Sequence, residues 1–138
     1  VYKEYCDFLG VKEVKSVVDI PFLPIQFFKT KNVIRQGHDF VEVFKSSGTT
    51  LGNRSIHYIS DIEIYKRSFF ETFKTQVVDP EKSIILALLP NYVQQGNSSL
   101  VFMVKSLIAK SKERLSGFYL DEVENLREIS PLGKKGSE

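Results

Sequence analysis

The apolar run that follows Ser83, Ile84 to Leu89, constrains the fold of this chain more than any other feature. The run has the length of one β-strand, and it lacks the alternation of apolar and polar residues that marks a strand with one wet face. Such runs are typical of strands buried on both faces of a parallel sheet. Helical patterns stand before and after it, so the sequence predicts an α/β fold, a mostly parallel sheet with crossover helices.

Periodicity and helix-capping residues predict the remaining elements. Ser60 and Glu63 have the spacing of a capping box, and apolar residues then recur at three- and four-residue steps. The expected elements are a short helix at residues 2–9, strands at 33–34, 41–45, 55–59, 83–89 and 116–120, and helices that begin at Ser60, Ser98 and Asp121.

Composition limits the function classes. With 138 residues, 42% of them hydrophobic and 26% charged, the chain has the make-up of an ordinary globular domain. A formal net charge of +2 demands neither nucleic acid nor a membrane surface as a partner. The single cysteine, Cys6, excludes an internal disulfide and fits a reducing compartment, and the longest apolar run is too short for a membrane span. We expect a cytoplasmic protein, and residues 1–138 to be part of a longer chain.

Two other segments have a structural interpretation. Pro21 and Pro24 prevent a regular helix, and the large apolar residues around them predict a buried connector rather than an exposed binding patch. Cys6 lies among the apolar residues of the first expected helix, which favours an inert buried thiol over a nucleophile.

A hydroxyl-rich segment follows the expected strand at 41–45 and is the main candidate site. It consists of Ser46, Ser47, Gly48, Thr49, Thr50, Gly52 and Arg54. Its glycines can direct successive backbone N–H groups at one anion, while the hydroxyls donate further hydrogen bonds without adding negative charge. This pattern indicates a phosphate-binding loop, although its spacing is not that of a Walker loop. A solvent-facing polar turn is the alternative.

A second polar segment, Pro90 to Ser99, follows the apolar strand. Open α/β sheets bind their ligands at the carboxyl ends of the strands, so the two segments are expected to converge there. A plain surface loop is the alternative for this segment.

The segment from Phe44 to Thr50 resembles the phosphate-binding signature of the adenylate-forming superfamily. More closely, the chain resembles the bacterial acyl-protein synthetase family, which includes the fatty-acid-activating subunits of the bacterial luminescence reductase. The strings that carry this resemblance, in order, are Ile20 to Ile25 with Phe27-Phe28-Lys29, Ser55-x-His57-Tyr58 with Asp61, Tyr65 and Ser68-Phe69, Leu88-Leu89-Pro90-x-Tyr92, and Gly96-x-Ser98-Ser99-Leu100-Val101.

The resemblance implies that residues 1–138 are a partial N-terminal α/β domain of an adenylate-forming enzyme. Such an enzyme uses ATP and Mg²⁺ to convert a carboxylic acid, by default a fatty acid, into an acyl-adenylate, and passes the acyl group to a thiol or protein acceptor. It further implies that Ser46, Ser47, Gly48, Thr49 and Thr50 hold the phosphates and that Arg54 supplies a counter-charge. The acceptor cysteine of the family lies in a region beyond this chain, so Cys6 is not that residue, and the chain alone is expected to be inactive.

Two alternatives stay open. Leu51 stands where the signature has its next glycine, which favours a non-catalytic module that binds phosphate or an acidic partner. The third possibility is a folded fragment without a competent site.

Overall fold

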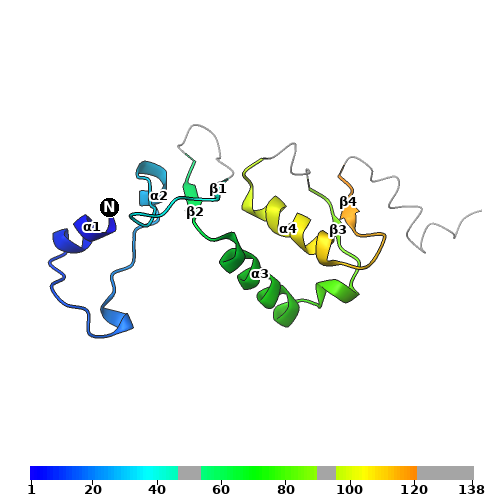
Figure 1. Ribbon diagram of the computed structural model, residues 1–138, viewed down its shortest axis with the longest axis horizontal. Helices are drawn as coiled ribbons and strands as arrows, with labels where there is room; N and C mark the ends of the chain where they lie inside the picture. Colours follow the sequence, from blue (N-terminus) through cyan, green and yellow to red (C-terminus); the bar gives the residue numbers. More distant parts are fainter. Residues whose placement is uncertain (47–53, 90–95, 121–138) are drawn as a thin grey trace, which may run out of the picture. The chain divides into compact units, whose positions relative to one another are not determined.

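A computed structural model describes residues 1–46, 54–89 and 96–120, and the chain separates into two compact units, Val1–Ile62 and Glu63–Glu138. Each unit contains one two-stranded β-sheet (Figure 1). The described residues also form four α-helices and two short 3₁₀ helices.

An antiparallel hairpin forms the sheet of the first unit. Its strands are β1 (Glu42–Lys45) and β2 (Ile56–Ile59), and the register pairs Phe44 with His57. Successive side chains of a strand point to opposite faces, and Phe44 is the one buried residue of the two strands, with 4% of its surface exposed. The strands expected at 41–45 and 55–59 are therefore confirmed.

Two short helices precede this hairpin. The first, α1 (Tyr2–Phe8), is followed by Gly10 at φ +72°, the left-handed conformation in which glycine commonly ends a helix. The second, α2 (Phe27–Thr30), contacts α1 through an edge-to-face pair of the Tyr5 and Phe27 rings, whose centroids are 5.3 Å apart. The expected helix at 2–9 is confirmed.

The segment between these helices is not the buried connector that its apolar residues predicted. It contains the 3₁₀ helix η1 (Val17–Asp19), where the Asp19 carboxylate accepts the Ser16 N–H at 2.8 Å. Beyond η1, the side chain of Phe22 is 95% exposed and that of Ile25 is 69% exposed. The prolines prevent a regular helix here, and no other part of the described first unit covers these side chains.

The core of the second unit lies at α3 (Ile62–Gln76), which apart from its first residue belongs to this unit, and at α4 (Ser99–Lys110). On α4, Val101 and Leu107 are almost completely buried, at 2% and 1% exposure. The Tyr65 ring of α3 contacts the Phe102 ring of α4, and the Tyr65 hydroxyl donates to the Ser99 carbonyl at 3.3 Å. Packing of apolar faces against each other thus joins the two helices.

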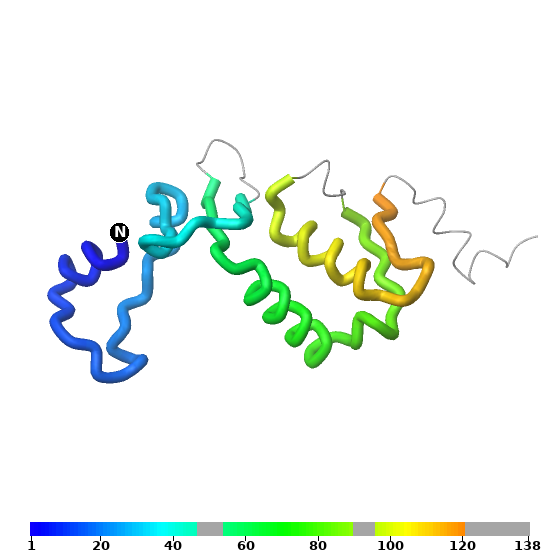
Figure 2. The backbone as a smooth tube through the Cα atoms, viewed as in Figure 1, coloured from blue at the N-terminus to red at the C-terminus, as the bar shows by residue number. Residues whose placement is uncertain are grey.

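A short crossover unit completes this part of the fold. Figure 2 follows the backbone from α3 through the 3₁₀ helix η2 (Pro80–Lys82) to β3 (Leu86–Ala87). After β3 and α4 comes β4 (Gly117–Phe118), which pairs in parallel with β3. Ser98 caps α4 as predicted, because its hydroxyl accepts the Val101 N–H at 3.4 Å.

The prediction of a mostly parallel sheet with crossover helices is wrong. β1 and β2 are antiparallel, and the connection between them, residues 46–55, is shorter than the crossover that a parallel pair requires. Only β3 and β4 are parallel, and they form a sheet of their own. The two sheets fall in different units. The described residues therefore contain two small sheets and one crossover helix.

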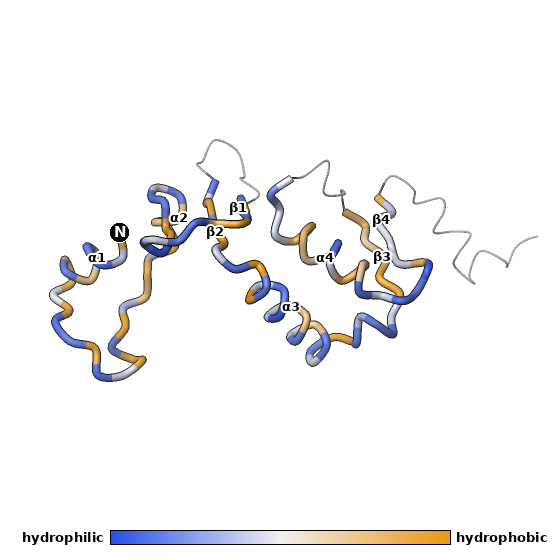
Figure 3. The backbone as a smooth tube through the Cα atoms, viewed as in Figure 1, coloured by the Kyte–Doolittle hydropathy of each residue, from blue (hydrophilic) through white to orange (hydrophobic). Residues whose placement is uncertain are grey.

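The apolar run that suggested this sheet contributes only the two residues of β3. Figure 3 shows the hydrophobic stretch that contains this strand. Ala87 is buried at 4% exposure, whereas Leu86 and Leu88 on either side are 45% and 59% exposed. The strand is thus buried on one face among the described residues, and not on both.

Other predicted elements differ in outcome. The helix expected from Ser60 forms but begins at Ile62, and the strand expected at 116–120 is confirmed at its centre as β4. Residues 33–34 form no strand, and the helix expected from Asp121 lies outside the described residues. Within the described ranges, no helix combines the length and the apolar character required to cross a membrane.

Candidate functional site

The described part of the candidate site is the closed end of the β1–β2 hairpin. The register that pairs Lys45 with Ile56 continues by one step to Ser46 and Ser55. The Ser46 N–H donates to the Ser55 carbonyl at 3.0 Å, and the Ser55 N–H donates to the Ser46 Oγ, also at 3.0 Å. Ser46 and Ser55 therefore close the ladder, and residues 47–54 connect the two strands.

This closure assigns two different roles to Ser46. Its backbone N–H bonds to the Ser55 carbonyl, so it is not among the amides that could point at a phosphate. Its hydroxyl oxygen accepts the Ser55 N–H, and its hydroxyl proton has no acceptor among the residues that the structure describes. Ser46 can therefore contribute to a phosphate site only through its side chain.

Two cations flank the closed end of the hairpin. Lys45 is the last residue of β1 and Arg54 directly precedes Ser55, and both side chains are exposed. Neither has an ion-pair partner among the residues that the structure describes. An exposed guanidinium without a carboxylate partner suits a phosphate, which it can bind through two parallel hydrogen bonds.

The other predicted site residues, Ser47, Gly48, Thr49, Thr50 and Gly52, lie outside the described residues. Most of the second polar segment, residues 90–95, also lies outside them, and Ser98 at its end is the cap of α4. The expected convergence of the two segments depended on a single parallel sheet. β1 and β3 belong to different sheets in different units, so no common sheet brings the two segments to one edge.

The side-chain contact between Ser55 and His57 at this end of the hairpin was not predicted from the sequence. Ser55 is buried, with 8% of its surface exposed, and its Oγ lies 3.3 Å from the Nε2 of His57. The His57 ring stacks on the Phe28 ring at a centroid distance of 4.6 Å and an angle of 21°. The alternation along β2 is the signal that could have revealed the pair, since residues two apart lie on one face.

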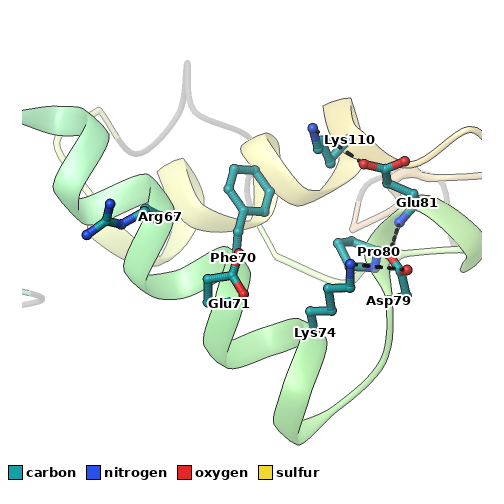
Figure 4. Close-up of a pocket in the computed structure, with 8 residues that line it drawn as sticks. All are labelled: Arg67, Phe70, Glu71, Lys74, Asp79, Pro80, Glu81 and Lys110. Carbon is teal, nitrogen blue, oxygen red and sulfur yellow. Dashed lines mark hydrogen bonds and ion pairs between the residues drawn. The ribbon is translucent and has the colours of Figure 1, made fainter.

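A pocket of about 280 Å³ lies in the second unit (Figure 4). Its lining residues are Arg67, Phe70, Glu71, Lys74, Asp79, Pro80, Glu81 and Lys110. Ion pairs occupy much of its polar surface: Lys74 lies 3.8 Å from Asp79, and Lys110 lies 3.5 Å from Glu81. Because each of these two lysines already faces a carboxylate, the pocket has no set of charges that favours one class of ligand.

Glu81 in this pocket also pairs with Lys112, at 3.1 Å. The hydrogen bond and charge of Lys112, followed by those of Lys110, hold the pKa of Glu81 below its ordinary value. This shift has a structural cause, the attachment of η2 to the end of α4. It is therefore no sign of catalytic chemistry.

The first unit has a hollow of about 410 Å³ with a largely apolar lining from α1 and α2, including Tyr5, Phe8 and Phe27. Phe8 is 86% exposed there, and the charged residues of the lining are Glu4 and Lys31. Within the described ranges, no group of three or more His, Cys, Asp or Glu side chains is placed to hold a metal ion.

Comparisons with protein-family models, with curated proteins and with solved structures find no match to this chain.

Proposed function

We propose that this chain is the N-terminal part of an ATP-dependent acyl-activating enzyme, in which the connection between β1 and β2 holds the triphosphate of ATP. The observation that carries the proposal is the closed end of the hairpin. Ser46 and Ser55 fix both ends of a segment rich in hydroxyls and glycine. The ordered set of strings that resembles the acyl-protein synthetases supports it from the sequence side.

The charges at this end of the hairpin suit a triphosphate. Lys45 and Arg54 stand at the two ends of the connection, with no carboxylate paired to either among the described residues. Two cations raise the local concentration of an anion, and hydroxyl donors bind it without a competing negative charge. The hydroxyl of Ser46, whose proton has no acceptor in the described ranges, adds one donor at the end of the hairpin.

Phosphate binding would accelerate the reaction by stabilising the leaving group, pyrophosphate. When a carboxylate attacks the α-phosphate of ATP, negative charge builds on the departing pyrophosphate. Donors placed at the β- and γ-phosphates stabilise that charge most strongly in the transition state. Bound Mg²⁺ would neutralise part of the same charge through the phosphate oxygens. In this proposal Ser47, Thr49 and Thr50 donate hydroxyl hydrogen bonds, Gly48 and Gly52 allow the loop to bend, and Arg54 supplies the counter-charge.

The substrate in this proposal is a carboxylic acid, with a fatty acid as the default, and the acyl group passes to a thiol or protein acceptor. These steps belong to the longer parent enzyme, which we expect in the cytoplasm. Leu51 favours the competing hypothesis of a module that binds phosphate without catalysis.

Titration of the intact parent protein with Mg·ATP tests the proposed phosphate site. We expect saturable binding that the double substitution Thr49→Ala, Thr50→Ala weakens at least about tenfold, since each lost donor costs about 1 kcal/mol. Thr75→Ala is the matched control, because Thr75 lies on α3 and donates its hydroxyl only within that helix. Equal affinity of the wild type and the double variant would refute the proposed role of the loop.

A further inference from the structure

Four side chains share the inward face of the β1–β2 hairpin at its closed end. Phe44 and His57 are register partners, and the next pair on that face is Ser46 and Ser55. Phe44 is buried at 4% exposure and Ser55 at 8%. A buried hydroxyl requires a hydrogen-bond partner, and the only side chain that supplies one to the Ser55 Oγ in the described residues is His57.

Ser55 thus forms hydrogen bonds with both its backbone and its side chain. Its backbone N–H and carbonyl both bond to Ser46, and its side chain bonds to the imidazole of His57. Loss of the hydrogen bond at the Ser55 hydroxyl is therefore expected to weaken the Ser46–Ser55 backbone pair, because both interactions involve the same residue. This connection is short because Ser55 and His57 are two apart on one strand, so both side chains lie on the same face.

Phe28 restricts the imidazole. Its ring lies nearly parallel to the His57 ring, at a centroid distance of 4.6 Å, which is the geometry of a stacked pair. Stacking limits rotation about the second side-chain torsion of His57 and so holds Nε2 toward Ser55. The α2 helix thereby contributes to the geometry of the hairpin end.

A nucleophilic Ser–His pair is the other chemistry that these residues could indicate. Burial of Ser55 argues against it, since a substrate carbonyl has little access to the Oγ. The separation of 3.3 Å is also long for a hydroxyl that a base activates. Moreover, no carboxylate among the described residues bonds to the other nitrogen of the ring.

We infer that His57 is a positioning residue: through Ser55 it holds the Ser46–Ser55 pair from which the phosphate-binding segment extends, and Phe28 fixes its orientation. The importance of this for ATP rests on the proposed function. The mechanical part, that His57 holds the closing pair, does not depend on any ligand.

Three variants separate the contributions. His57→Phe keeps an aromatic ring against Phe28 but removes the hydrogen bond to Ser55. His57→Gln restores a polar atom near the position of Nε2. Phe28→Leu leaves His57 in place and removes the stacking, and it serves as the second test if His57→Phe fails to fold.

Amide hydrogen exchange measures the closing pair directly. In His57→Phe we expect exchange at the Ser46 and Ser55 amides to be about tenfold faster, because the local opening free energy falls by roughly one hydrogen bond. The Val41 amide is the internal control, since it donates to the Ile59 carbonyl at the opposite end of the hairpin. It should exchange at the wild-type rate. His57→Gln should restore slow exchange, and Phe28→Leu should show an intermediate acceleration.

Mg·ATP affinity then connects the positioning to function. We expect His57→Phe to weaken binding about tenfold and His57→Gln to recover most of it. Unchanged exchange at Ser46 and Ser55 in both His57→Phe and Phe28→Leu would overturn the inference. Equal acceleration at Val41 would also overturn it, because that result indicates general loosening of the hairpin. If the intact parent protein binds no Mg·ATP but shows the exchange pattern, the proposed function is refuted and the role of His57 is still supported.

Discussion

The hydroxyl groups of Ser111 and Ser116 lie 2.8 Å apart and join the end of α4 to the start of β4. Ser111 donates its only hydroxyl proton to the Ser83 carbonyl at 2.8 Å, so the proton between the two serines must come from Ser116. The Oγ of Ser116 in turn accepts the Ile85 N–H at 3.0 Å. Two small side chains thus connect the segments before β3 and β4.

Ser116→Ala should therefore destabilise the second unit. The substitution leaves the part-buried Ile85 N–H without its acceptor, and we expect a loss of about 1–2 kcal/mol in the free energy of unfolding. Urea denaturation measures this value. Ser68→Ala on the exposed face of α3 is the control and should cost nothing, because alanine is a good helix former. Equal effects of the two substitutions would contradict the role of the serine pair.

Leu107 should be the most sensitive position of α4. It is 1% exposed, so Leu107→Ala leaves a cavity as well as losing buried apolar surface, with an expected cost of about 2–5 kcal/mol. Leu100 on the same helix is 53% exposed, and Leu100→Ala should cost less than about 1 kcal/mol. Chemical denaturation of the two variants gives the comparison. A smaller loss of unfolding free energy for Leu107→Ala than for Leu100→Ala would contradict the position of Leu107 in the core.

The N-terminus of α4 depends on Ser98. Its hydroxyl accepts the Val101 N–H, and loss of such a cap costs about 1 kcal/mol, which we expect for Ser98→Ala in thermal unfolding. Ser98→Asp should retain the stability, since aspartate caps equally well and its charge suits the helix N-terminus. If Ser98→Ala proved neutral, the cap would contribute nothing to stability.

Glu81 should make the stability depend on pH on the acid side. Lys112 and Lys110 hold its pKa below the ordinary value in the folded chain, so its contribution is fully present above the pKa of the unfolded state. The contribution is lost as the pH falls through the folded-state pKa. The melting temperature of Glu81→Gln should thus lie slightly below that of the wild type at neutral pH, and the difference should vanish in acid.

Glu71→Gln is the matched control for this prediction. Glu71 lines the same pocket, and its carboxylate has no ion-pair partner among the described residues. We expect no pH-dependent difference for this variant. Added salt should also reduce the effect of Glu81→Gln, because both lysines are exposed and their charges are screened. A difference that grew toward low pH would contradict the assigned direction of the pKa shift.

Local patterns in the sequence predicted local structure well. Alternation around Phe44 and the hydroxyl of Ser98 each depend on neighbours within a few residues, and both appear as predicted in β1 and at the start of α4. The connection of Ser111 with Ser83 depends on the approach of distant segments, and nothing in the sequence pattern indicates it.

The fold class was harder to predict for the same reason. A continuous apolar run shows that burial is favourable, but it does not identify the strands that pair with it. Ile84, Leu86 and Leu88 are each at least 45% exposed, whereas the prediction required them to be buried. Strand direction was likewise undetermined, since Phe44 alternates with its neighbours in the same way in parallel and antiparallel strands.

The candidate site shows the same limit. Residue types alone led to the prediction of the hydroxyls and of the cation Arg54 as phosphate ligands, and this stays a prediction. The pairing of Ser46 with Ser55, which engages the Ser46 backbone N–H, depends on the hairpin register. Prediction of that detail required the direction of the strands.

Exchange of labelled pyrophosphate into ATP, measured on the intact parent protein with a series of carboxylic acids, tests the proposed formation of an acyl-adenylate. We predict exchange that depends on the acid and on Mg²⁺, and that falls by more than about a hundredfold in Thr49→Ala, Thr50→Ala, since removal of a transition-state donor costs about 3 kcal/mol. Absence of exchange with every acid, or full exchange in the double variant, would contradict it.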